Sequence, residues 1–150
     1  MKKTIWFDMD GTIANLYAVE NWLPKLRAED PSPYLEAGVM WNMSLLARLM
    51  NKVQQAGYEI GIISWTSKGG SKSYNEAVAS AKMKWLKLHL ASVNFNYIMI
   101  VDYGTPKATF MNTKYDILFD DEENNIANWD GKAFTPDYIT LVLKELIDKR

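Results

Sequence analysis

The chain has 150 residues, of which 48% are hydrophobic, and its 17 basic and 18 acidic residues leave a net charge of −1. These values predict one globular domain with a buried core, and they give no general attraction to nucleic acid or to an anionic membrane. Cysteine is absent and His89 is the single histidine, which excludes disulfides, thiol catalysis and histidine-rich metal sites. Any catalysis would therefore rest on carboxylates, lysines, hydroxyls and a metal.

The first hydrophobic stretch of the chain is short. The run after Lys3 is interrupted by Asp8 after four residues, which is too few for the core of a signal peptide. No other stretch approaches the roughly 18 apolar residues that a bilayer span requires. We therefore expect a cytoplasmic protein with no membrane partner.

The first predicted elements are a buried strand and a small insertion. Residues 4–7 are of strand-forming types and run into two carboxylates, Asp8 and Asp10. Residues 13–40 show helical spacing over 15–27 and then a proline-rich break. Since this stretch is too long for a simple loop, we interpret it as a small helical cap inserted after the first strand.

The rest of the chain alternates helices and strands. Continuous apolar strands between amphipathic helices are typical of a parallel sheet covered by helices. We therefore predict an α/β, three-layer Rossmann-like fold with a mostly parallel sheet and helices on both faces. The predicted order after the insertion is helix 42–56, strand 58–63, loop 67–73, helix 74–90, strand 97–101, a short helix from 105, strand 117–119, strand 131–134 and a last helix from 135.

The helix predicted over 74–90 has an apolar side and a basic side. We expect the apolar side to face the core, because helical spacing brings its members together. We expect the basic side to be solvated. The apolar side consists of Tyr74, Val78, Ala81, Trp85 and Leu88, and the basic side of Lys82, Lys84 and Lys87.

Polar residues follow several of the predicted strands. In open α/β sheets the site lies outside the carboxyl ends of the strands, so these residues are expected to meet. Carboxylates, a hydroxyl and a lysine around a metal are what phosphoryl transfer requires. The alternative for the first pair is a polar turn after the strand. The residues are Asp8 and Asp10 after the first strand, Ser64 after the second, Lys107 in the short helix after the third, and Asp120 and Asp121 after the fourth.

This set of motifs resembles the haloacid dehalogenase (HAD) superfamily, specifically its aspartate-nucleophile phosphatases. Residues 8–12, Asp-Met-Asp-Gly-Thr, match the D-x-D-G-T signature, while Ser64, Lys107 and residues 120–121 match the second, third and fourth motifs in order. The motifs cover essentially the whole chain, so residues 1–150 are expected to form a single HAD-like domain. The small cap further resembles the deoxyribonucleotidase-type branch and small phage-encoded relatives.

The resemblance implies a Mg²⁺-dependent phosphomonoester hydrolase. Asp8 would be the nucleophile that forms an aspartyl-phosphate, and Asp10 the general acid and later the base. Mg²⁺ would be held by Asp8, the backbone carbonyl of Asp10 and one of Asp120 and Asp121, with Asp120 favoured as the direct ligand.

The expected substrate is a small phosphate ester such as a (deoxy)nucleotide, and nucleic acid is not an expected partner. Two alternatives stay open. One is a non-catalytic phosphate-ligand binder or regulatory protein on the same fold. The other is a phosphatase of polynucleotide ends.

The remaining site candidates have a functional and a structural interpretation. Ser64 would hydrogen-bond a phosphate oxygen or cap a turn. Lys107 would neutralise the nucleophile and the phosphoryl group, with Lys114 as the rival for this role. Backbone N–H groups after Asp8 and around Gly11 and Thr12 would cradle the phosphate.

Aromatic residues near the motifs also have two interpretations. Tyr17, Trp41 and Trp65 would form an apolar wall for the substrate, or they would belong to the core. Thr66 and Lys68 follow directly and are further candidates for substrate contact, although Lys68 would otherwise lie in an exposed surface loop.

Overall fold

Five strands form one parallel sheet at the centre of the computed structural model, which describes residues 1–149. Each neighbouring pair runs parallel, in the order β5-β4-β1-β6-β7. The prediction of an α/β, Rossmann-like fold on a mostly parallel sheet is therefore confirmed. The strands are β1 (Thr4–Phe7), β4 (Glu59–Trp65), β5 (Tyr97–Val101), β6 (Ile117–Phe119) and β7 (Lys132–Phe134).

The first strand lies in the middle of this sheet. The chain continues from β1 to β4 and β5 on one side, and then returns to β6 and β7 on the other. Ile5 pairs with Ile60 of β4 and with Ile117 of β6, and all three are buried. The strand order thus reverses between β1 and β6, and a crevice for a ligand is expected at the carboxyl ends of these two strands.

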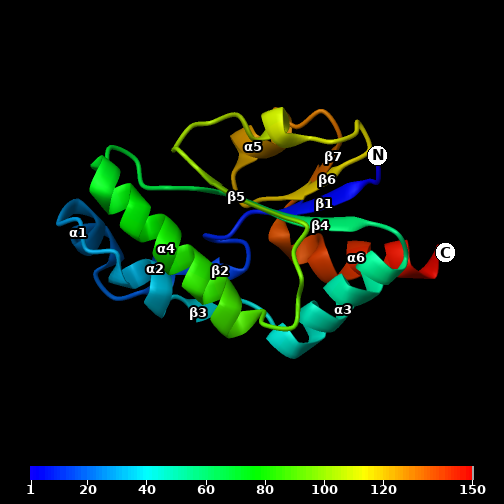
Figure 1. Ribbon diagram of the computed structural model, residues 1–150, viewed down its shortest axis with the longest axis horizontal. Helices are drawn as coiled ribbons and strands as arrows, with labels where there is room; N and C mark the ends of the chain where they lie inside the picture. Colours follow the sequence, from blue (N-terminus) through cyan, green and yellow to red (C-terminus); the bar gives the residue numbers. More distant parts are fainter. Residues whose placement is uncertain (150) are drawn as a thin grey trace.

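Three longer helices cover one face of the sheet. They are α3 (Met43–Gln55), α4 (Lys72–His89) and α6 (Ile139–Asp148), and their apolar residues join Ile5 and Ile62 in the main core. Shorter elements cover the opposite face, where Trp6 and Ile63 pack against Trp129. These elements are the 3₁₀ helix η2 (Lys107–Phe110) and α5 (Glu123–Ala127), whereas the 3₁₀ helix η3 (Pro136–Tyr138) directly precedes α6. Figure 1 shows α5 on one side of the strands and α3 and α6 on the other.

The two longest helices begin at capping side chains. The side chain of Asn42 accepts a hydrogen bond from the N–H of Leu45, and Ser71 accepts one from Tyr74. The buried side of α4 differs from the prediction at Leu88, whose relative exposure is 67%. The buried stripe instead follows four-residue steps to Leu86, so the helix turns Leu88 to solvent.

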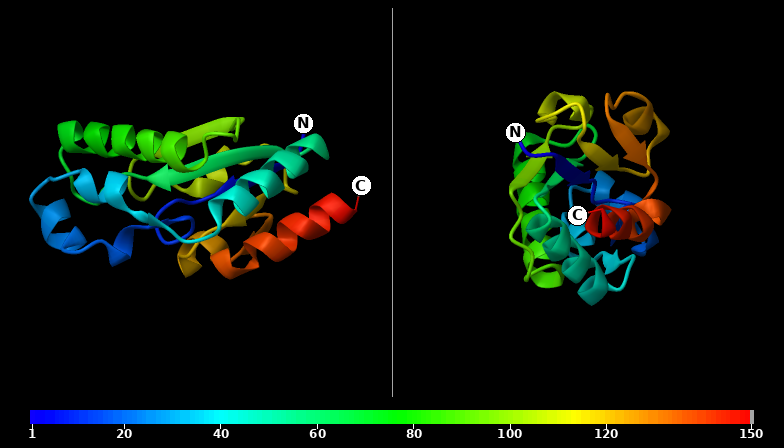
Figure 2. Two further views of the ribbon diagram at one scale, coloured as in Figure 1. Left: turned by 90° about the horizontal axis from the view of Figure 1, so that it is seen from below. Right: turned by 90° about the vertical axis from the view of Figure 1, so that its right-hand side faces the viewer.

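The insertion after β1 is a compact segment, residues 14–39, which we call the cap segment. It begins with β2 (Ala14–Asn15) and ends with β3 (Gly38–Val39), which pair antiparallel. Between them lie the 3₁₀ helix η1 (Leu16–Ala18), α1 (Trp22–Arg27) and α2 (Ser32–Glu36), so the helix expected over 15–27 is divided into two short elements. Figure 1 and Figure 2 show α1 and α2 beside α4, at the far end of the molecule from the start of β1.

Apolar contacts hold the cap segment against α4. Leu16 and Tyr34 of the cap segment pack with Tyr74, Val78 and Ala81 of the helix. The first half of α4 is thus covered by the cap segment and the second half by the sheet, which joins the two parts of the fold. Across the described chain, none of the helices combines the length and hydropathy needed to cross a membrane.

Candidate active site

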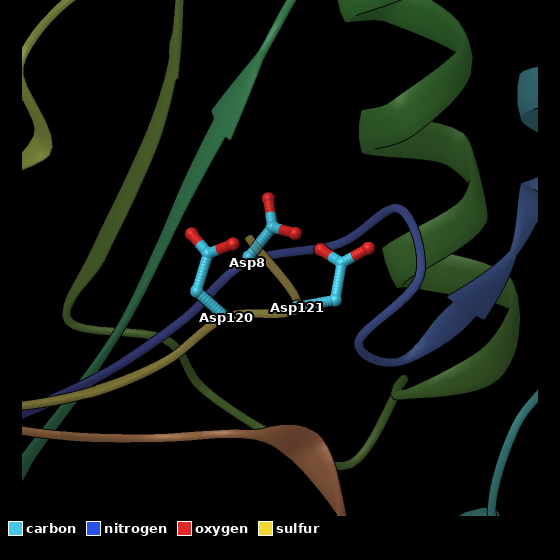
Figure 3. A group of neighbouring side chains, drawn as sticks. All are labelled: Asp8, Asp120 and Asp121. Carbon is cyan, nitrogen blue, oxygen red and sulfur yellow. The ribbon is translucent and has the colours of Figure 1, made fainter. Parts of the chain in front are cut away.

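Three carboxylates gather where β1 and β6 end. Asp8 follows β1, Asp120 and Asp121 follow β6, and one oxygen from each lies within 4.8 Å of the other two. Figure 3 shows the three side chains rising on the same side of these strand ends. Because the strands are parallel neighbours, residues that follow them are brought together at one edge.

The charge of Asp8 contributes to raised pKa values at both of its neighbours. Burial, followed by the charge of Asp8, raises the pKa of Asp120 to about 6. The same two causes raise the pKa of Asp121 to about 8. Negative charges held this close favour either a proton or a cation between them.

Lys107 lies between two of these carboxylates. Its side chain is 2% exposed, and its Nζ donates hydrogen bonds to Asp8 Oδ1 at 2.9 Å and to Asp120 Oδ2 at 2.7 Å. Burial alone would lower the pKa of Lys107, but the charges of Asp8 and Asp120 outweigh it and raise the pKa above its ordinary value. Lys114, the rival candidate, lies over the ring of Tyr115 instead. The geometry therefore brings Lys107 to the carboxylates.

Asp10 contacts a second buried lysine, which sequence reasoning missed. Asp10 Oδ2 accepts a hydrogen bond of 2.8 Å from Nζ of Lys82. The expectation that Lys82 is solvated is wrong, because its side chain is 1% exposed. The four-residue spacing of Val78, Lys82 and Leu86 was the available signal, since it continues the buried stripe of α4. Burial raises the pKa of Asp10, and the charge of Lys82 opposes that rise.

The turn after β1 fixes the orientation of Asp8. The hydroxyl of Thr12 donates to Asp8 Oδ2 at 3.1 Å, and Thr12 is fully buried. Gly11 has a φ of 77°, and a Cβ there would collide with the carboxylate of Asp121. A side chain at position 11 would therefore be strained and would displace a member of the carboxylate group.

The backbone amides of Gly11 and Thr12 make hydrogen bonds within the turn. The N–H of Gly11 donates to the carbonyl of Ala14 at 2.9 Å, and that of Thr12 donates to Met9 at 3.0 Å. Both amides are thus used within the turn, and neither residue lines the cavity described next.

A cavity of about 370 Å³ opens between the strand ends and the cap segment. Two aromatic pairs border it: Tyr17 with Trp22, at 5.0 Å between ring centroids, and Trp65 with Tyr103, at 4.9 Å. Trp41, by contrast, donates its indole N–H to the carbonyl of Thr12 and packs against the core. The cavity is lined by Asp8, Asp10, Lys107, Asp120, Asp121, Glu122, Asn125, Trp65, Thr66, Ser67, Lys68, Tyr103 and, from the cap segment, Leu16, Tyr17, Trp22, Leu23, Leu26, Arg27 and Tyr34.

Two hydroxyls at the end of β4 have different surroundings. Ser64 is fully buried, accepts a hydrogen bond from Lys82 at 2.7 Å and does not line the cavity. Thr66 does line it, and among residues 1–149 its Oγ1 is the buried side-chain polar atom left without a hydrogen-bond partner. The cause is that β4 is longer than predicted: Trp65 still pairs with Val101 of β5, so Thr66 is the residue at the edge. A ligand oxygen would satisfy this hydroxyl.

Asp120 is held by several hydrogen bonds besides Lys107. The N–H of Glu122 donates to Asp120 Oδ1 at 2.9 Å, and the side-chain amide of Asn125 donates to Oδ2 at 3.1 Å. Sequence reasoning missed Asn125, as it missed Arg27, Tyr34 and Tyr103 at the cavity. None of these four follows a strand with a recognisable motif, so only the folded chain brings them to the site.

Comparison with solved structures finds similarity to a chain of a Pnkp1/Rnl/Hen1 complex, with a TM-score of 0.58 and 14% sequence identity. The match covers 90% of this chain and 45% of that one, so this chain spans less than half the length of its neighbour. Models of protein families give no match to the sequence, and neither do the sequences of curated proteins. At this identity the similarity shows the fold, a parallel α/β sheet with its helices.

Proposed function

We propose that this chain is a Mg²⁺-dependent phosphomonoester hydrolase of the HAD type, which acts through an aspartyl-phosphate on a small ester such as a (deoxy)nucleotide. One observation carries the proposal: Lys107 is held between Asp8 and Asp120, while Asp10 lines the same cavity. A carboxylate beside a buried ammonium is a nucleophile that can approach an anionic phosphate.

The chain's own residues supply the steps. Asp8, oriented by Thr12, attacks phosphorus, and the ammonium of Lys107 offsets the charge of both reacting groups. Asp10 gives a proton to the leaving oxygen and later takes one from the water that hydrolyses the intermediate. The unpartnered hydroxyl of Thr66 donates to a phosphate oxygen, a role that the sequence had suggested for Ser64.

The donor set fits a hard cation. Asp8, Asp120 and Asp121 offer only carboxylate oxygens, the ligands that Mg²⁺ prefers, and the raised pKa values of Asp120 and Asp121 show that the negative charge of the group is not fully offset. The carboxylate of Asp10 is bonded to Lys82, which leaves its backbone carbonyl as the ligand that the resemblance implies. When bound, Mg²⁺ would polarise the phosphoryl oxygens.

The proposed substrate rests on the cavity walls. The pairs Tyr17–Trp22 and Trp65–Tyr103 offer aromatic faces against which a planar base can stack. Arg27 and Lys68 are the cations of the outer cavity wall, too few to follow the backbone of a long polynucleotide. This favours a small ester over a polynucleotide end.

The test is phosphate release from p-nitrophenyl phosphate, nucleoside monophosphates and an oligonucleotide with a terminal phosphate. Each is assayed with Mg²⁺ and with EDTA. We expect activity that requires Mg²⁺ and that falls by ~10⁴-fold or more in Asp8→Asn, as for other lost nucleophiles. Lys114→Met, away from the cavity, is the matched control and should match the wild type.

The other outcomes discriminate the alternatives. Activity confined to the oligonucleotide would favour the polynucleotide-end phosphatase. Inactivity on every ester, in a folded protein that still binds inorganic phosphate, would favour the non-catalytic binder.

A further inference from the structure

Lys82 is a buried charge whose role the proposed mechanism leaves open. An ammonium removed from water is unfavourable unless it is paired and fully hydrogen-bonded. Its three donors meet three acceptors: Asp10 Oδ2 at 2.8 Å, Ser64 Oγ at 2.7 Å and the carbonyl of Trp65 at 2.7 Å. The ring of Tyr34 lies 5.2 Å from Nζ. The ammonium is therefore held by the end of β4 and by the turn after β1, and it is covered by the cap segment.

Lys82 lies behind the cavity rather than in it. Asp10 and Trp65 line the cavity, whereas Lys82 and Ser64 do not. With all three protons engaged and no cavity surface, the ammonium has no free donor for a substrate. Any effect of Lys82 on the reaction must pass through Asp10 or through the end of β4.

The hydrogen bond from Lys82 makes the two carboxylate oxygens of Asp10 different. Lys82 holds Oδ2, and within residues 1–149 no other side chain or backbone group is hydrogen-bonded to this carboxylate. Oδ1 is thus the oxygen left for proton exchange in the cavity. Without Lys82, nothing in the described chain would fix which oxygen faces the leaving group.

We propose that Lys82 is a positioning residue for proton transfer by Asp10, an inference that rests on the proposed function. As the bond between Asp8 and phosphorus forms and the ester bond breaks, Asp10 Oδ1 delivers its proton to the leaving oxygen. Lys82 keeps its three protons throughout. Through Ser64 and Trp65 it also ties the acid to the end of β4, from which Thr66 follows.

The test uses leaving groups that differ in their need for a proton. Nitrophenolate departs without one, whereas the alkoxide of a deoxyribonucleoside 5′-monophosphate requires one. The constant kcat/KM covers only the steps up to this departure. For Lys82→Met we expect kcat/KM to fall by ~10²–10³-fold on the alkyl ester, the range of general acid catalysis, and by less than about 5-fold on p-nitrophenyl phosphate.

Controls separate positioning from a general loss of structure. Lys84→Met changes an exposed lysine of the same helix and should leave both esters unaffected. In Asp10→Asn, the added Lys82→Met should cause no further loss on the alkyl ester, because the two residues act as one unit. Equal losses on the two esters, or additive losses in the double variant, would overturn the proposal.

If Lys82→Met does not fold, Ser64→Ala tests the same proposal. It removes one of the three acceptors of Lys82 by a small change. We expect a several-fold loss on the alkyl ester and less than a two-fold loss on the aryl ester. An equal loss on both would instead make Ser64 a phosphate ligand and overturn the role of Lys82. A wild-type protein inactive on both esters would reject the proposed function itself, whereas an active wild type with unselective variants would reject only this inference.

Discussion

Within residues 1–149, two buried lysines each pair with a carboxylate of the candidate site, but they differ in position. Lys107 binds Asp8 and Asp120 and lines the cavity, whereas Lys82 binds Asp10 and lies behind it. The first comes from a one-turn 3₁₀ helix after the edge strand β5, and the second from the longest helix. Burial and pairing alone therefore do not distinguish a lysine proposed to contact the reacting atoms from one proposed to hold a neighbouring side chain in place.

Among the variants that test this contrast, Lys107→Met is expected to have the largest effect. In the proposed mechanism, the ammonium of Lys107 faces the transferring phosphoryl group, which is common to all esters. We expect kcat/KM to fall by ~10²–10³-fold, the usual loss for one such charge-stabilising group. The loss should be equal on p-nitrophenyl phosphate and on a nucleoside monophosphate. If this variant instead shows the selectivity expected of Lys82→Met, the distinction between the two lysines fails.

A smaller effect is expected from Thr66→Val, which keeps the shape and removes the hydroxyl. If Thr66 donates to a phosphate oxygen, kcat/KM should fall by about 10²-fold on aryl and alkyl esters alike. The melting temperature should be unchanged or higher, because the lost hydroxyl has no partner in the free protein. If the kinetics are unchanged, Thr66 does not donate to the phosphate. Ser64, which is hydrogen-bonded to Lys82, would then again be the candidate for that contact.

The smallest expected effect is on stability. It concerns Asp120 and Asp121, the carboxylates in the group around Lys107. The raised pKa values of Asp120, about 6, and Asp121, about 8, mean that these groups hold protons more tightly in the folded state than in the unfolded state. Their contribution to the stability of the metal-free protein is therefore present near pH 4 and is lost as the pH rises toward 8.

Mg²⁺ should reverse that loss. At a concentration of about 100 times its Kd, a ligand adds roughly 2.7 kcal/mol, or about 5–10 °C in melting temperature for a chain of this size. We expect the increase to be larger at pH 8 than at pH 5, and thermal unfolding at both values measures it. Asp121→Asn should reduce both the pH dependence and the response to Mg²⁺. If Mg²⁺ raises the melting temperature equally at the two pH values, the cation does not bind at Asp120 and Asp121.

The sequence predicts the strand ends well and the second lysine poorly, for a physical reason. Asp8 and Lys107 follow apolar runs, and turns after buried strands are visible in the chain itself. Lys82 was assigned to the solvated side because lysines are rarely buried. Its burial depends on Asp10, 72 residues away, which no local pattern reveals.

The end of β4 is a second place where the local sequence does not predict the structure correctly. Because Ser64 is the first polar residue after an apolar run, the sequence pattern predicts that the strand ends at residue 63. Pairing with β5 carries the strand on to Trp65 and places Thr66 at the edge. Pairing between strands is a tertiary property, and it shifts a boundary that composition alone sets two residues too early.

The short ribbon of β2 and β3 has an evolutionary consequence. Asn15 and Gly38 are paired neighbours, so the cap segment leaves and rejoins the rest of the fold at a single point. An insertion of another length or sequence can be grafted between these two residues without moving the ends of β1 and β6. Such a graft would have to shield Tyr74 and Val78 on α4 and to replace the contacts of the cap segment with Lys82 and Trp85. The cap segment could therefore be exchanged while the residues at the strand ends stay in place. Selection could then alter which substrate the proposed enzyme binds separately from the reaction that it catalyses.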